Sequence, residues 1–195
     1  MKPLPYFVVS FFALLLPHMV TAEERAPLKI GVIAGYSGAA KEWADYGRMA
    51  LELARDEINQ NGGVRGRPVE LLFEDSQTVP AKAVSAYTKL ATIDKVDAII
   101  GELWAFLTNP LIPLSERMKV PTISPTVMDQ SIRDTSPYFF SLGHRYVSLE
   151  GAVRQFFDLH PDLKRIGVLC WDDPWGRANL AVWKMILTER NISIS

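Results

Sequence analysis

The sequence has few of the side chains that form disulfides and metal sites. Its 195 residues include one cysteine, Cys170, and three histidines. A single cysteine excludes an intramolecular disulfide. Three histidines, one of them His18 near the amino terminus, leave little material for a metal centre. We therefore expect neither a metal site nor another cofactor. Because Cys170 closes the apolar run Ile166–Cys170, we expect it to be a buried structural thiol.

An excess of charge of one sign is also lacking. The chain carries 21 Lys and Arg residues against 22 Asp and Glu residues. A net charge this close to zero does not favour nucleic acid or an anionic membrane surface as a partner.

Beyond the amino terminus, no apolar run is long enough to cross a membrane. At the amino terminus, Lys2 precedes the apolar run Tyr6–Leu16, and Val20-Thr21-Ala22 supplies the small residues that a signal peptidase accepts. This is the pattern of a secretory signal peptide. The run is shorter than the ~20 residues that span a bilayer. We predict that residues 1–22 are a signal peptide cleaved after Ala22, and that the exported chain has no stable membrane insertion.

After this leader, predicted strands and helices alternate. Short apolar runs predict buried strands, and apolar residues at intervals of three or four predict helices. The predicted strands are Lys29–Ala34, Val69–Phe73, Ala98–Ile100, Val120–Ser124, Tyr138–Leu142, Arg165–Cys170 and one that begins at Ile192. The predicted helices run from Tyr46 to Asn61, from Pro80 to Ala91, over Asn109–Met118 with a kink or early end at Pro113, around Leu149–Phe156, and over Trp175–Arg190. Repeated βα units predict an α/β fold with a doubly wound parallel sheet covered on both faces.

Several motifs in this pattern occur in a specific order. The first predicted helix contains Asp56-Glu57-Ile58-Asn59 and ends in Asn61-Gly62-Gly63-Val64-Arg65-Gly66-Arg67. The next strand ends in Glu74-Asp75. The later motifs are Ala98–Gly101, Val120–Pro125 and Arg165–Val168. Together they resemble the leucine/isoleucine/valine-binding protein family of periplasmic substrate-binding proteins, and the resemblance extends from Leu28 to Ser195.

The resemblance implies a type I periplasmic-binding-protein fold with two lobes and a ligand cleft at the hinge. The first crossing between lobes would fall near Leu142–Tyr146. We expect residues 23–142 to form the first lobe without its returning segment, and residues 143–195 to begin a second lobe, because Ser195 falls where a strand has just started.

The resemblance also implies a function. It predicts the periplasmic substrate-binding component of an ABC importer, which binds an amino acid or a related small organic acid or amide by hinge closure and then docks on a membrane permease. The alternative is the same module acting as the ligand-binding sensor of a signalling receptor. In neither case is the chain an enzyme.

The predicted ligand site lies at the carboxyl ends of the strands, where open parallel sheets bind ligands. The loops at those ends carry Trp43, Trp104 and Trp175, which we expect to line the cleft, whereas Trp171 fits the cleft and the core equally well. The candidate ligand-binding residues are Ser37, Trp43, Trp104, Ala105, Phe106, Thr126, Met128, Arg145 and Trp175.

The resemblance places Ala105 where the family has a serine and Met128 where it has a threonine. Two hydroxyl donors to an α-carboxylate are thereby lost, so a more apolar or aromatic ligand becomes a hypothesis. Trp43 agrees with family members that have tryptophan there, and Trp175 matches the aromatic residue of the second lobe. Arg145, at the predicted crossing, is either a bidentate partner for a carboxylate or a solvated surface arginine.

A remote alternative is an exported serine hydrolase that uses Ser37. Gly35-Tyr36-Ser37-Gly38-Ala39 follows a strand and resembles a nucleophile elbow. That motif requires a helix immediately after the serine, whereas the helix here is predicted at about Trp43 or later. His144 and His160 are the remaining candidate bases. We predict no catalytic residue.

Overall fold

The computed structural model of the chain describes residues 25–126, 135–143, 146–172 and 174–195. Five parallel strands form one sheet in the order β2-β1-β3-β4-β5. These strands are β1 (Leu28–Ala34), β2 (Val69–Asp75), β3 (Ala98–Ile100), β4 (Thr122–Ser124) and β5 (Phe139–Ser141). The predicted α/β class and parallel sheet are confirmed.

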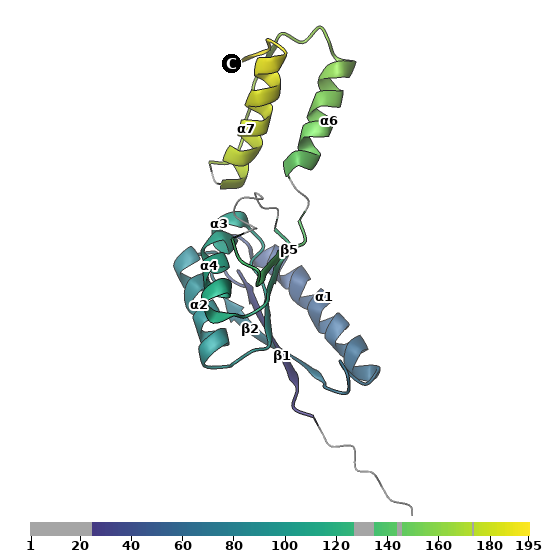
Figure 1. Ribbon diagram of the computed structural model, residues 1–195, viewed down its shortest axis with the longest axis vertical. Coiled ribbons are helices and arrows are strands. Elements are labelled where there is room, and N and C mark those ends of the chain that lie inside the picture. Colours follow the sequence, from purple (N-terminus) through teal and green to yellow (C-terminus); the bar gives the residue numbers. More distant parts are fainter. Residues whose placement is uncertain (1–24, 127–134, 144–145, 173) are drawn as a thin grey trace, which may run out of the picture.

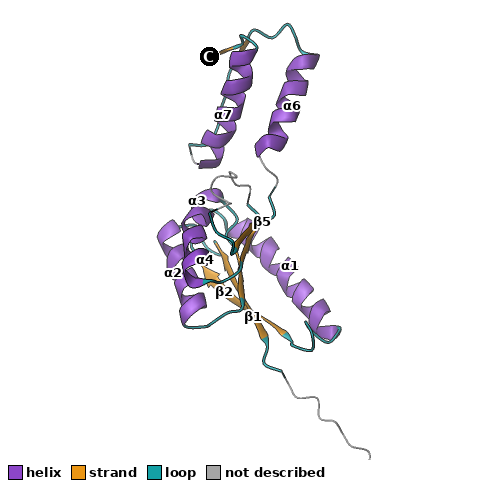
Figure 2. Ribbon diagram, in the orientation of Figure 1, coloured by secondary structure: helices purple, strands orange, loops and turns teal. Residues whose placement is uncertain are grey.

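Helices lie on both sides of this sheet (Figure 1, Figure 2). On one side are α2 (Pro80–Thr92), α3 (Ala105–Thr108), the 3-10 helix η1 (Asn109–Leu111) and α4 (Ile112–Met118), and on the other is α1 (Lys41–Gln60). The predicted helix Asn109–Met118 is divided into η1 and α4 just before Pro113, in agreement with the expected interruption at this residue. Pro113 lies in the first turn of α4, where a missing N–H removes no helical hydrogen bond.

The main hydrophobic core lies between the sheet and α2. Tyr87 and Leu90 of α2 pack with Ile33 and Ile99 of the sheet, and all four side chains are buried. The Tyr87 hydroxyl lies 2.8 Å from Thr122 Oγ1, so the polar end of this large side chain is also paired inside the core.

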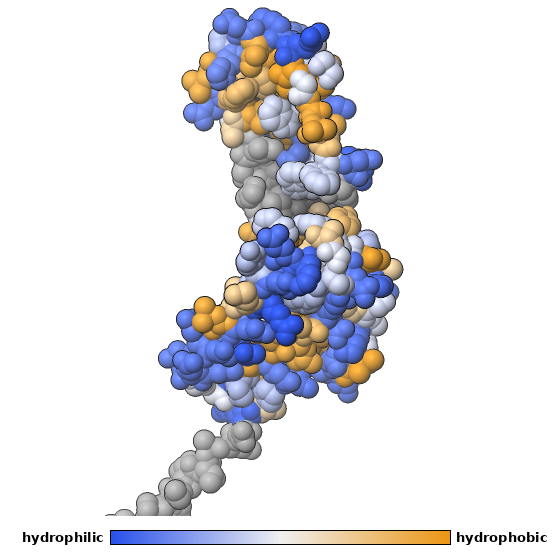
Figure 3. Space-filling model, turned by 180° about the vertical axis from the view of Figure 1, so that it is seen from behind, coloured by the Kyte–Doolittle hydropathy of each residue, from blue (hydrophilic) through white to orange (hydrophobic). Residues whose placement is uncertain are grey.

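The opposite face of the sheet is covered differently. Arg48 of α1 places its guanidinium 4.4 Å from the centre of the Phe73 ring, a cation–π contact. The apolar stripe predicted on this helix is largely exposed instead: Tyr46, Met49 and Leu53 are each more than 60% accessible. Figure 3 shows apolar areas among polar ones on the back of the molecule.

The family-like motif that spans the end of α1 and the turn after it has a clear structural role. The Asn59 side chain accepts a hydrogen bond from the Val69 N–H at 2.7 Å and donates one to the Val69 carbonyl at 2.9 Å. Gly63 adopts a φ of +73°, and a Cβ there would lie 2.1 Å from the Arg67 carbonyl oxygen, so only glycine fits the turn. Arg67 in turn donates to the Ala26 carbonyl and so anchors the chain before β1.

A second, smaller unit follows β5. The helices α6 (Tyr146–Leu159) and α7 (Pro174–Glu189) accompany a parallel pair of two-residue strands, β6 (Arg165–Ile166) and β7 (Ser193–Ile194). Phe157 of α6 and Ile186 of α7 are buried against each other's helices in a separate cluster. The predicted boundary between lobes at residues 142 and 143 remains a prediction.

Two expectations about the run Arg165–Cys170 are wrong. The strand ends at Ile166, Leu169 is fully exposed, and the Cys170 thiol is exposed instead of buried. The physical reason is that β6 pairs only with β7 among the described strands, and the part of the run beyond Ile166 has no neighbouring strand to hold it. Among the described residues, no helix combines the length and the apolarity that a membrane span requires.

From the burial of the two side chains, we predict that replacing Leu90 lowers the free energy of unfolding much more than replacing Leu53. Leu90 is fully buried, whereas Leu53 is 62% exposed. Leu90→Ala is expected to lower the free energy of unfolding by about 2–5 kcal/mol, because it removes buried methyl groups and leaves a cavity. Leu53→Ala is the matched control and should change it by less than about 1 kcal/mol. Urea denaturation of both variants measures this, and equal losses would contradict the assignment of the core.

Candidate ligand-binding site

The carboxyl ends of the parallel strands meet at one edge of the sheet. The loop after β1 is fixed there to the end of β2. The Ser37 N–H and hydroxyl both donate to the Asp75 carboxylate, at 3.1 and 2.7 Å, and the Gln77 N–H donates to it at 2.8 Å. Partial burial opposes ionisation, but the hydrogen bonds from Ser37 and Gln77 outweigh it and lower the pKa of Asp75. Asp75 therefore acts as an anionic anchor for the first loop.

The loop after β3 is held by hydroxyl groups around the Glu102 carbonyl. This oxygen accepts hydrogen bonds from Ser124 Oγ at 2.6 Å and from Thr108 Oγ1 at 3.0 Å. Ser124 Oγ also accepts from the Thr126 N–H, and the Thr126 carbonyl accepts from Ser141 Oγ. One chain of hydrogen bonds thus connects the ends of β3, β4 and β5.

The side chain of Glu102 is the most unusual group at this edge. It is fully buried. Burial raises the pKa of its carboxyl to about 7, although hydrogen bonds from the Ser76 hydroxyl and the Leu103 N–H act in the opposite direction. Glu102 Oε1 and the hydroxyl of the nearby Tyr36 are both buried without a partner among the described residues. Sequence reasoning missed Glu102, although a carboxylate one glycine beyond the predicted strand Ala98–Ile100 is a recognisable signal.

Aromatic side chains occupy the same edge. Trp104 lies directly before α3, and its ring centre is 5.8 Å from that of Phe106, at an interplanar angle of 38°. Trp43 lies in the first turn of α1 and is 63% exposed. Trp175 lies in the first turn of α7 and is 42% exposed. Trp171, in the loop before α7, is 75% exposed, so the alternative of a core position is excluded for it.

The two units approach each other at this edge. Helices α3 and α7 are in contact, and Figure 1 shows the first turn of α7 pointing toward the sheet unit. The predicted residues Trp104, Ala105 and Phe106 are therefore brought close to the start of the helix that carries Trp175.

The remaining predicted residues differ in what they can offer a ligand. Ser37 is already bound to Asp75 on the β2 side of the edge. Ala105 and Thr126 are buried. Met128 and Arg145 lie outside the described residues. The assignment of these residues as ligand contacts remains a prediction.

The geometry around Ser37 does not resemble a hydrolase nucleophile. Its hydroxyl donates to a carboxylate instead of to a histidine, and α1 begins at Lys41, four residues later. A nucleophile elbow requires the serine itself to stand at the strand-to-helix turn. Among the described residues, no group of three or more His, Cys, Asp or Glu side chains lies in an arrangement that would hold a metal ion.

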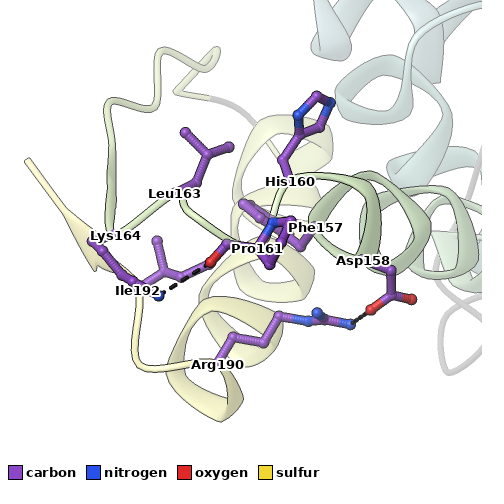
Figure 4. A pocket seen from close by; sticks show the side chains of 8 residues that line it. All are labelled: Phe157, Asp158, His160, Pro161, Leu163, Lys164, Arg190 and Ile192. Carbon is purple, nitrogen blue, oxygen red and sulfur yellow. Dashed lines mark hydrogen bonds and ion pairs between the residues drawn. The ribbon is translucent and has the colours of Figure 1, made fainter.

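A pocket of about 300 Å³ lies elsewhere, at the far end of α6 and α7 (Figure 4). Its polar side chains are mostly paired with neighbours: Arg190 binds Asp158 at 2.6 Å, and Lys164 donates to the Pro161 carbonyl at 3.1 Å. Arg190 follows the carboxyl end of α7, whereas Trp175 lies in its first turn, roughly 20 Å away at 1.5 Å per helical residue. This pocket is therefore separate from the strand edge.

Glu102 predicts a specific pH dependence of stability. Between the ordinary pKa of 4.5 and the folded value of about 7, the folded chain keeps a proton that the unfolded chain has lost. The free energy of unfolding should therefore fall as the pH rises through this range, by about 3 kcal/mol at most. Glu102→Gln keeps the shape without the charge and should remove this slope.

The other perturbed carboxyl at this edge, Asp75, does not contribute to the change in stability between pH 5 and pH 8. Its pKa is lowered, so its contribution to stability is lost only as the pH falls below about 4, outside the window of Glu102. Denaturation at pH 5, 6, 7 and 8 tests the prediction. Equal slopes in the wild type and in Glu102→Gln would show that Glu102 does not titrate there.

The sequence was compared with families of known proteins and with individual relatives. The family model described as periplasmic binding protein matches residues 27–194. A Leu/Ile/Val-binding protein, BraC3 of Rhizobium johnstonii, is 29% identical over 171 residues, which are 87% of this chain and 46% of the relative.

Solved structures share the architecture. A solute-binding protein of an ABC transporter from Rhodopseudomonas palustris, in complex with 3,4-dihydroxybenzoic acid, matches 87% of this chain and 46% of its own with a TM-score of 0.75 and 22% identity. The branched-chain amino acid substrate-binding protein LivJ of Streptococcus pneumoniae, in complex with isoleucine, matches 82% and 46% with a TM-score of 0.74 and 22% identity. The chain spans less than half the length of these proteins. It belongs to the periplasmic binding protein family.

Proposed function

We propose that the chain is the substrate-binding component of an ABC importer, or part of it, and that it binds an amino acid or a related small organic acid or amide. The observation that carries this proposal is the edge of the sheet at which the carboxyl ends of the five strands lie together with α3 and the start of α7. Exposed tryptophans of both units, Trp43 and Trp175, lie at this edge. Exposed aromatic side chains gathered at one edge are typical of a binding surface.

The related proteins support a small organic ligand without defining it. One is named for leucine, isoleucine and valine, one structure contains a dihydroxybenzoic acid and another contains isoleucine. These ligands share a carboxyl group and an apolar or aromatic body. Because this chain has the same architecture, these ligands support the proposal that it too binds a small organic acid.

The proposed mechanism is binding by lobe closure, a motion for which periplasmic binding proteins are a standard example. We assign residues 23–142 to one lobe and residues 143–195 to the other. A ligand that contacts both lobes stabilises the closed state, because only that state makes both sets of contacts. The closed state would then dock on the permease.

The rigid and mobile parts of this mechanism can be separated. The hydrogen bonds around the Glu102 carbonyl keep the loops after β3 and β4 in one position. We place the hinge at Leu142 and Gly143, which lie between β5 and α6 and belong to neither hydrophobic cluster. The chain supplies ligand contacts and no chemical step. Export would require removal of residues 1–22, after which the protein acts in the periplasm.

Thermal unfolding of the full chain with L-amino acids and small carboxylic acids, each at 1 mM, tests this function. A ligand present at 100 times its Kd should stabilise the folded state by about 2.7 kcal/mol. Trp175→Ala should weaken that stabilisation, because it removes a ring of the second unit from the edge. Ile93→Ala is the control, because Ile93 is exposed at the end of α2. If no compound in the panel stabilises the wild type, the proposed function is wrong.

A further inference from the structure

We propose that the ligand is an aromatic carboxylic acid and not a branched-chain α-amino acid; this inference rests on the proposed function and narrows its ligand class. Four observations at the strand edge carry it: the exposed rings, the commitment of the hydroxyl groups, the commitment of the carboxylates, and the position of one arginine.

The first observation is the surface that the rings form. Trp104 and Phe106 contact each other directly and are both partly exposed. Trp171 and Trp175 belong to the other unit, and Trp175 starts the helix that contacts α3. Exposed aromatic side chains gathered on two facing elements are typical of a binding surface. Rings give the largest gain in affinity when the ligand presents a flat face to them, because offset or edge-to-face ring pairs add to the burial of apolar area.

The second observation concerns the hydroxyl groups that would bind an α-carboxylate. Ser37 donates to Asp75, and both Ser124 and Thr108 donate to the Glu102 carbonyl. Position 105, at the start of α3, is an alanine with a buried side chain. Breaking a bond to the Glu102 carbonyl to serve a ligand would leave a buried acceptor without its partner, which costs free energy. Ser37 would have to give up a charge-assisted bond to the Asp75 carboxylate. These hydroxyls are therefore part of the scaffold and are not free for a ligand.

The third observation concerns the carboxylates that would bind an α-ammonium group. Asp75 already accepts from Ser37 and Gln77. Glu102 is buried beneath the surface, and its raised pKa favours the neutral form. An ammonium group would have to compete with Ser37 and Gln77 for Asp75 or keep a charge on the buried Glu102, whereas a ligand without an ammonium group leaves both carboxylates as they are.

The fourth observation concerns the carboxyl group of the ligand. Arg177 lies near the start of α7 and is 60% exposed. Its present partner Asp172 is almost fully exposed, and ion pairs of this kind contribute little free energy. Arg177 can therefore exchange Asp172 for a ligand carboxylate without leaving a buried charge unpaired.

The experiment is calorimetric titration of the full chain with two matched pairs of ligands. Benzoate and cyclohexanecarboxylate have the same charged group and similar volume, and only benzoate has a π face. Phenylpropionate and phenylalanine differ in the ammonium group. We expect benzoate to bind at least tenfold more tightly than cyclohexanecarboxylate, and phenylpropionate at least tenfold more tightly than phenylalanine or isoleucine.

Variants connect this preference to the rings. Trp104→Ala should abolish the difference between benzoate and cyclohexanecarboxylate, and Trp104→Phe should retain most of it. Leu53→Ala, on the exposed face of α1, should leave both affinities unchanged. If Trp104→Ala does not fold, the test uses Trp104→Phe, in which the preference for benzoate should be retained because an aromatic ring is still present.

The possible results separate this inference from the function. Tighter binding of isoleucine or leucine than of either aromatic acid would overturn the aromatic preference and leave the substrate-binding function intact. Equal binding of benzoate and cyclohexanecarboxylate would overturn the role of the rings. The absence of binding by every acid and amino acid would contradict both the function and the inference.

Discussion

The two hydrogen bonds accepted by the Glu102 carbonyl hold together the edge of the sheet on which the proposed site depends. Thr108 and Ser124 come from different elements, so this one oxygen ties the start of the short helical region to the end of the neighbouring strand. Hydroxyl groups are well suited to this position because each can donate to one atom while accepting from another. Ser124 does so by also accepting from the Thr126 N–H.

In this arrangement, the residues that hold the loops in place differ from those that would contact the ligand. The hydroxyls of Ser37, Thr108 and Ser124 at the strand ends are bound to a carboxylate or to the backbone, while the rings of Trp104 and Trp175 are at least partly exposed. In a site of this kind, hydrogen bonds hold the strand ends in place, and apolar rings form the surface that contacts the ligand. Specificity would then depend on which rings are present at the edge, and changes of ligand class would require few changes in the sheet below.

Much of the fold could be predicted from the sequence because the periodic signals were strong. The strand Ala98–Ile100 and the helix that begins at Pro80 appear where the pattern of apolar residues places them. The run after Arg165 was misread, because an apolar run indicates a buried strand only when neighbours cover it, and the sequence does not show which neighbours are present. The same limit applies to α1, whose contacts with the sheet include Arg48 over Phe73 and Asn59 with Val69, whereas Tyr46, Met49 and Leu53 of its apolar stripe are exposed.

The site was only partly predictable. Tryptophans in loops after strands were recognisable, and Trp104 does lie beside Phe106. The bond from Ser37 to Asp75 joins residues 38 positions apart, and the bond from Ser124 to the Glu102 carbonyl joins residues 22 positions apart. No local sequence pattern encodes such contacts.

The pair of hydrogen bonds between Asn59 and Val69 has a consequence for the behaviour of the chain in a crowded compartment. β2 is the outermost strand of the sheet, and its unpaired backbone groups are a template on which a strand from another molecule can assemble. The amide of Asn59 occupies both backbone groups of Val69 and so imitates a neighbouring strand at that position. The start of the edge is thereby closed to intermolecular pairing, and a side chain within a family-like motif serves as a guard against aggregation.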